Sequence, residues 1–71
     1  MTRDLSRVLR EAWEQAPKGD VVVRVHLFGI ENAEALQGVN LRALVELAGI
    51  PKPYATEIHK GMRLADYVRL K

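Results

Sequence analysis

Residues 40–61 of this chain, NLRALVELAGIPKPYATEIHKG, carry the clearest structural pattern in the sequence. Asn40 is a natural helix N-cap, because its short side chain can accept a hydrogen bond from a free backbone N–H of the first turn. Gly49 suits the position after a last helical residue, where a left-handed backbone is needed. The sequence therefore predicts a helix over about 41–48, whose buried stripe is Leu41, Leu44, Val45 and Ala48.

A second helix is predicted from Pro53 to about Lys60, because proline is favoured at the first helical position. Its apolar residues Tyr54 and Ile58 stand four apart and so share a face. Gly61 is expected to end this helix. Two helices joined by a tight turn within about 20 residues have the spacing of a helix-turn-helix.

The same stretch resembles the helix-turn-helix of the lambda repressor/Cro (Xre) family. That family commonly has Leu-Ala before the turn, Ala-Gly-Val/Ile at the turn, and Tyr-x-Ser-x-Ile before a glycine. The matching residues here are Leu44, Ala48, Gly49, Ile50, Tyr54, Thr56, Ile58 and Gly61, with Arg63 near the family's basic position. The departures are Leu41, Val45, Pro51 and His59, and they bear on the contacts with phosphate and the fit to the groove more than on the fold.

The resemblance implies that residues 53–60 form a recognition helix that enters the major groove of double-stranded DNA. Lys52 would then reach a guanine edge or a phosphate, and Thr56 a phosphate or a thymine methyl group. Glu57 would accept from cytosine N4 or hold a neighbouring arginine. Tyr54 either packs on the inner face or contacts phosphate through its hydroxyl. Lys60, Arg63 and Arg42 would lie on the DNA backbone and position the domain. The predicted DNA-binding residues are thus Lys52, Pro53, Tyr54, Thr56, Glu57, Lys60, Arg63 and Arg42.

The flanking segments complete an all-α domain. Residues 2–16 predict an amphipathic helix whose apolar face includes Trp13. Residues 20–36 are ambiguous, because the valines at 21–25 favour a strand and the following residues favour a helix. We favour a helix that begins at an N-cap, Asp20, and reaches Leu36, with a short extended segment at 21–25 as the alternative. Gly29 would permit the close approach of another helix.

The predicted fold is thus a compact all-α domain of four to five helices that spans residues 1–71, with the helix-turn-helix unit at about 40–61. Residues 62–71 offer a last helical turn or two. The chain has 71 residues, no cysteine and two histidines, which leaves no material for disulfides or a cysteine-rich metal site. It lacks the long apolar stretch of a membrane span and the apolar core of a signal peptide, so the expected compartment is the cytoplasm.

The formal net charge of +2 is unevenly distributed. Residues 51–71 hold five basic and two acidic side chains, whereas residues 1–50 hold six basic and seven acidic ones. A basic C-terminal third is a candidate footprint for an anionic partner, although a solvated surface can have the same composition.

The side chains for nucleophilic catalysis are scarce, since Ser6 is the one serine and no cysteine is present. We therefore expect neither an enzyme nor a cofactor. The favoured function is sequence-specific binding of double-stranded DNA by a small transcriptional regulator. The alternative is a helical protein–protein interaction module on a similar scaffold, supported by Glu57 and the acidic N-terminal part. RNA binding is disfavoured, because no aromatic pair is placed for base stacking.

A single copy with so few basic groups is expected to bind DNA weakly. Five phosphate contacts would give a slope of about −4.5 in log affinity against log salt. Useful specificity then requires a homodimer on two half-sites or a protein partner. The candidates for a dimer surface, chosen by size, are Trp13, Phe28 and residues 62–70.

Overall fold

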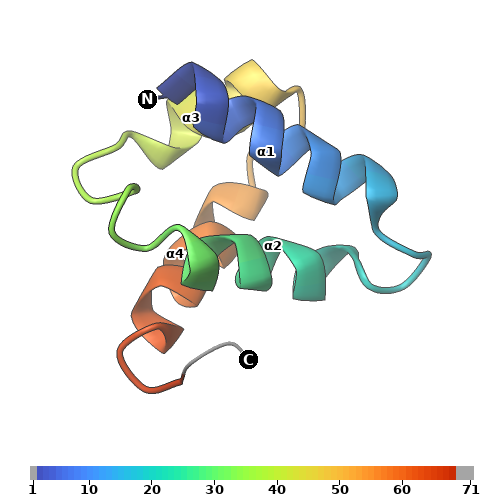
Figure 1. Ribbon diagram of the computed structural model, residues 1–71. Helices are drawn as coiled ribbons and strands as arrows, with labels where there is room; N and C mark the ends of the chain where they lie inside the picture. Colours follow the sequence, from blue (N-terminus) through green and yellow to red (C-terminus); the bar gives the residue numbers. More distant parts are fainter. Residues whose placement is uncertain (1, 69–71) are drawn as a thin grey trace.

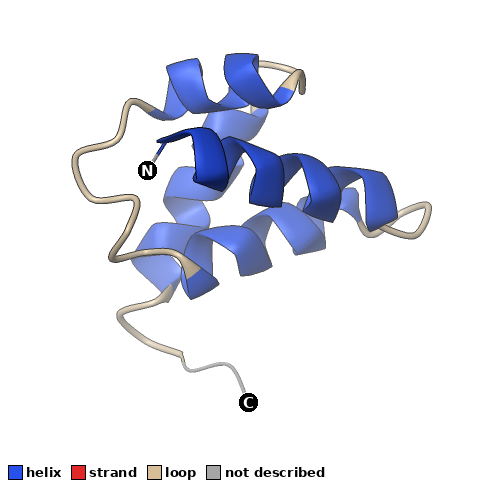
Figure 2. Ribbon diagram, turned by 45° about the horizontal axis from the view of Figure 1, so that its top comes forward, coloured by secondary structure: helices blue, strands red, loops and turns tan. Residues whose placement is uncertain are grey.

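The computed structural model describes the backbone of residues 2–68 and the side chains of residues 4–68. Within this part of the chain there are four helices and no strand: α1 (Thr2–Gln15), α2 (Val21–Glu31), α3 (Leu41–Ala48) and α4 (Tyr54–Leu64). Helix α2 packs most extensively against α4, and α1 packs against α3 and α2. Figures 1 and 2 show α1 and α2 side by side, with α4 behind α2. The prediction of an all-α domain is confirmed.

All four helices contribute to one apolar core. Its ten buried side chains include no polar or charged residue: Leu5, Leu9, Val25, Phe28, Leu36, Leu44, Val45, Ala48, Ile50 and Ile58. Trp13 lies partly buried against this core. Phe28 is only 3% exposed, so its proposed place on a dimer surface is wrong. None of the helices in the described part is long and apolar enough to cross a membrane.

The ambiguous segment after residue 20 begins as a helix. Helix α2 starts at Val21, so the extended alternative for 21–25 is wrong. Asp20 occupies the N-cap position as predicted, but its side chain makes no capping hydrogen bond. Val25 is fully buried, which shows that packing against the core overrides the strand preference of the valines.

Helix α2 ends at Glu31, five residues earlier than predicted. At the C-cap, both the backbone N–H and the side-chain Nδ2 of Asn32 donate to the carbonyl oxygen of Phe28, and each donor–acceptor distance is 3.0 Å. Residues 32–38 then form a series of turns. Leu36 is still only 1% exposed, so its apolar side chain fills the core from a turn rather than from a helix.

Two glycines allow α2 and α4 to touch backbone to backbone. A Cβ atom built on Gly29 would lie 2.6 Å from the carbonyl oxygen of Ile58 and 3.0 Å from the Cα of Gly61. The close approach predicted for Gly29 is therefore confirmed. Gly61 does not end α4, as the sequence had suggested, because the helix continues to Leu64. The predicted extra helical turns after residue 61 are partly present in α4, and residues 69–71 lie outside the described part.

Helix α1 contacts and stabilises the connection between α3 and α4. Nη1 of Arg10 donates to the carbonyl oxygens of Ala48 at 3.1 Å and Gly49 at 3.3 Å. Nε of the same guanidinium lies 3.2 Å from Oε2 of Glu14. Further along α1, Trp13 contacts Tyr54 edge to face, with ring centroids 4.8 Å apart. The α3–α4 unit is therefore held from outside by contacts that start in α1.

Candidate nucleic-acid interface

The helix-turn-helix geometry follows from the residues at the ends of α3. Oδ1 of Asn40 accepts a hydrogen bond from the backbone N–H of Ala43 at 3.1 Å, as its N-cap role predicts. At the other end Gly49 has φ 73°, the left-handed conformation that lets the chain leave the helix. Ile50 follows as a buried residue of the core. The predicted turn is thus present, with the glycine and the isoleucine in their expected roles.

Helix α4 begins one residue later than predicted. Pro53 lies at the N-cap position with αR angles, and Tyr54 is the first residue of the helix. The backbone N–H groups of Tyr54 and Ala55 donate to the carbonyl oxygens of Pro51 and Lys52, at 3.1 and 3.0 Å. These bonds form a tight first turn that places Lys52 just in front of α4.

One side of α4 presents polar residues to solvent. Lys52, Thr56, His59 and Arg63 follow one another at spacings of four, three and four residues, and all are exposed. This spacing puts Thr56, His59 and Arg63 in one row along the helix. Lys52 lies in the turn just before α4 and lines the same hollow as Thr56 and His59. We call these four residues the α4 stripe.

The N-terminal part of the α4 stripe borders an open hollow between the starts of α3 and α4. Arg42 reaches it from α3, and Lys52, Pro53 and Thr56 from the α4 side. Four of the eight predicted site residues therefore come together here. The full lining of this α3–α4 hollow is Asn40, Leu41, Arg42, Lys52, Pro53, Ala55, Thr56 and His59.

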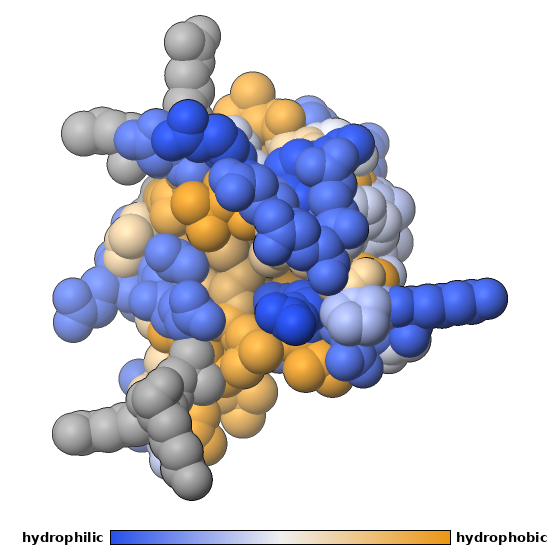
Figure 3. Space-filling view, turned by 45° about the vertical axis from the view of Figure 1, so that its right-hand side comes forward, coloured by the Kyte–Doolittle hydropathy of each residue, from blue (hydrophilic) through white to orange (hydrophobic). Residues whose placement is uncertain are grey.

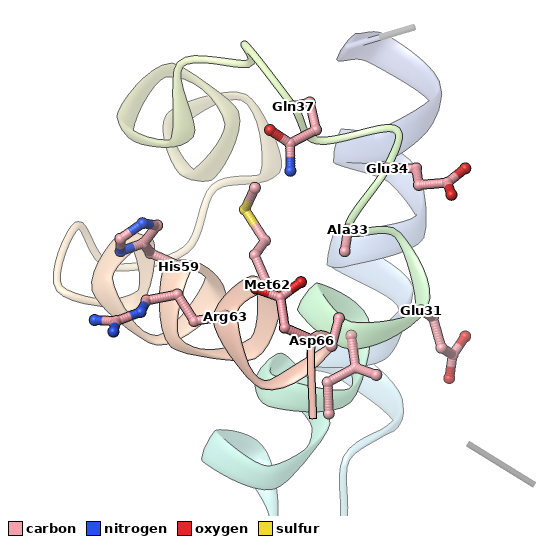
Figure 4. A pocket seen from close by; sticks show the side chains of 10 residues that line it. Glu31, Ala33, Glu34, Gln37, His59, Met62, Arg63 and Asp66 are labelled. Atoms are coloured by element: carbon pink, nitrogen blue, oxygen red, sulfur yellow. The ribbon is translucent and has the colours of Figure 1, made fainter. Parts of the chain in front are cut away.

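Arg63, the last residue of the α4 stripe, borders a second hollow between the ends of α2 and α4. This α2–α4 hollow is lined by Ile30, Glu31, Ala33, Glu34, Gln37, His59, Met62, Arg63, Ala65 and Asp66. Figure 4 shows Met62 extending towards Gln37, with His59 and Arg63 together on one side. His59 lines both hollows, although in the sequence it stands out only as a departure from the family pattern. Its spacing from Thr56 was the signal that could have found it.

Tyr54 turns away from the α4 stripe. Its ring is partly buried and meets Trp13 at an interplanar angle of 84°. Of the two roles left open for Tyr54, the structure supports packing on the inner face.

Glu57 and Lys60 lie on the side of α4 that meets α2. Oε1 of Glu57 is 2.7 Å from Nε2 of His26, and Oε2 is 3.5 Å from Nζ of Lys60. Because an ionised carboxylate only accepts, the imidazole N–H of His26 donates to it. This hydrogen bond is the main reason that the pKa of Glu57 lies below its ordinary value, and the Lys60 ammonium adds to the effect. Neither residue lines the α3–α4 hollow.

The arrangement of α3, turn and α4 agrees with a comparison against protein families. The HTH-like domain family model matches residues 1–71. The chain belongs to the HTH-like domain family. No curated protein and no solved structure matches it. Membership of the HTH-like family is consistent with DNA binding in general and does not single out the narrower lambda repressor/Cro family.

Proposed function

We propose that this HTH-like domain binds double-stranded DNA sequence-specifically and acts as a small transcriptional regulator in the cytoplasm, without catalysis or a cofactor. Helix α4 is the recognition helix, docked in the manner of the lambda repressor/Cro family. The observation that carries the proposal is the α3–α4 hollow, at whose rim Arg42 and Lys52 bring cations from two different helices.

The α4 stripe supports this proposal by its chemistry. Lys52 and Arg63 are cations that can pair with phosphates, and an exposed threonine can hydrogen-bond phosphate or contact a thymine methyl group. The carboxylate of Glu57, which would repel DNA, is engaged by His26 and Lys60 at the α2 side instead. The exposed row of α4 is therefore free of acidic side chains between Lys52 and Arg63.

The experiment is a fluorescence anisotropy titration of a labelled random-sequence duplex at low and moderate salt. Micromolar binding that weakens steeply with salt supports the proposal. Lys52→Ala is expected to weaken binding about three- to tenfold and to reduce the salt slope by about 1. The matched control is Lys18→Ala, which removes an exposed lysine of the α1–α2 connection, away from the α3–α4 turn (Figure 1). No binding at low salt, or equal losses in both variants, contradicts the proposal.

A second candidate function, a protein-interaction module, is favoured by exposed apolar side chains. Tyr67 is 83% exposed, and Leu64 and Val68 are also exposed beside it. Figure 3 shows a band of apolar surface between polar side chains on the face that includes the α1–α2 side of the molecule. On this interpretation Lys52→Ala changes nothing, whereas Tyr67→Ala abolishes retention of a protein partner in a pull-down with the purified domain.

A further inference from the structure

His59 stands in the middle of the α4 stripe, with Thr56 three residues before it and Arg63 four residues after it. Its side chain is exposed. It is also the residue that the α3–α4 hollow and the α2–α4 hollow share. A molecule that covers the stripe from Lys52 to Arg63 must therefore cover His59.

The charged groups around His59 favour an anion on the stripe side. In the α3–α4 hollow these neighbours are Arg42 and Lys52, and no acidic residue lines it. In the α2–α4 hollow they are Arg63 together with three carboxylates, those of Glu31, Glu34 and Asp66. Figure 4 shows that Glu31 and Glu34 point away from His59, that Asp66 lies beside Met62 in the middle of the hollow, and that Arg63 lies beside His59. An anion between Lys52 and Arg63 would thus meet cations on both sides of the imidazole.

We propose that His59 is a further DNA contact and that it holds a backbone phosphate as the protonated imidazolium, so that DNA binding takes up a proton. The inference rests on the function proposed above. Histidine is the side chain whose charge ordinarily changes between pH 5 and 8, whereas lysine and arginine keep their charge throughout that range. Both ring nitrogens of the imidazolium are donors, which suits phosphate oxygens.

The direction of the pH dependence follows from proton linkage. If the DNA-bound state holds more protons than the free state, affinity is highest at low pH and falls as the pH rises. For one histidine whose proton is bound about tenfold more tightly in the complex, the loss of affinity between pH 6 and pH 8 is about sixfold. His26, the other histidine of the chain, lies 2.7 Å from Oε1 of Glu57 through its Nε2 and lines neither the α3–α4 hollow nor the α2–α4 hollow.

The test measures duplex binding by anisotropy at pH 6, 7 and 8 and constant ionic strength. The wild-type chain should lose about sixfold in affinity over this range. His59→Gln should bind with no pH dependence and as weakly as the wild type at pH 8. His59→Lys should bind independently of pH and as tightly as the wild type at pH 6. His26→Gln, checked for helicity by circular dichroism, should keep the wild-type pH dependence.

Three outcomes overturn the inference. A pH dependence that persists in His59→Gln assigns the proton to another group, and wild-type binding that does not change with pH shows that no proton is taken up. Either result leaves the proposed DNA-binding function intact. Absence of binding at every pH overturns that function together with this inference.

Discussion

Glu57 shows how one side chain can be placed by a neighbour that is distant in the sequence. In the sequence it belongs to the predicted recognition helix, where a carboxylate faces DNA awkwardly. In the structure its oxygens contact His26, which lies 31 residues earlier, and Lys60 one turn later. The carboxylate is therefore a link between α2 and α4.

This link predicts a contribution to stability that depends on pH. Because the pKa of Glu57 is lowered in the folded chain, its contribution is present above the pKa of the unfolded chain, about 4.5. It is lost as the pH falls below that value, since the unfolded chain then binds the extra proton more readily. Urea unfolding at pH 3 to 7 should show a smaller acid-side loss of stability in Glu57→Gln than in the wild type. Identical acid limbs for the two chains would contradict this assignment.

At the scale of the elements, the crossing of α2 and α4 depends on glycine at both contact points. Replacing glycine by alanine inside a helix normally stabilises the helix by about 1 kcal/mol. Gly61→Ala should nevertheless destabilise the chain, by about 2–3 kcal/mol, because the new methyl group would meet the backbone of His26 and Gly29. Thermal and urea denaturation measure the loss. A gain in stability would show that the two helices can separate at small cost.

Much of the element pattern could be predicted, because it depends on neighbours in the chain. The spacing of apolar residues predicted α1 and α3, and Asn40 and Gly49 correctly predicted the two ends of α3. The errors concern residues whose role is set by tertiary contacts. Gly61 has the local signature of a helix end, but its function is to admit α2. Leu36 continues the helical spacing of α2, although Asn32 has already ended that helix.

Only part of the candidate site could be predicted, because some of its residues are placed by tertiary contacts. Arg42 and Lys52 were named from the motif, and the structure brings both to the α3–α4 hollow. The sequence could not show that Glu57 turns to His26 or that Tyr54 packs on Trp13, because the partners lie in α2 and α1. His59 was not predicted as a site residue, because it departs from the pattern of the lambda repressor/Cro family.

For the whole molecule, the number of free cations on the stripe side limits the electrostatic part of DNA binding. Arg42, Lys52 and Arg63 are exposed there, whereas Lys60 is held beside Glu57. At pH 8, where the imidazolium of His59 adds least, three phosphate contacts give a slope of about −2.7 in log affinity against log salt, below the −4.5 expected from five. A titration series across salt concentrations measures the slope for a random duplex. A slope near −4.5 would bring Lys60 and further cations into the interface.

The size of α4 also predicts how many copies occupy a specific site. Its 11 residues extend about 16 Å, the length of about five base pairs of DNA. Selection from a random duplex library should therefore enrich two half-sites whose centres are about 10 base pairs apart, each occupied by one copy. Sedimentation analysis of the selected duplex should find two chains per site. Enrichment of one isolated half-site with one chain bound would contradict the expectation of a dimer.

The division of α4 among its neighbours limits how the domain could be redesigned. One side of the helix is occupied by Trp13 of α1 and another by α2, through Gly29 and His26. A foreign recognition sequence would therefore best be grafted onto the row of Lys52, Thr56, His59 and Arg63, all of which are exposed. A library that varied these four positions alone would explore new targets on an unchanged scaffold, whereas replacement of the entire helix would exchange the scaffold along with the reading surface.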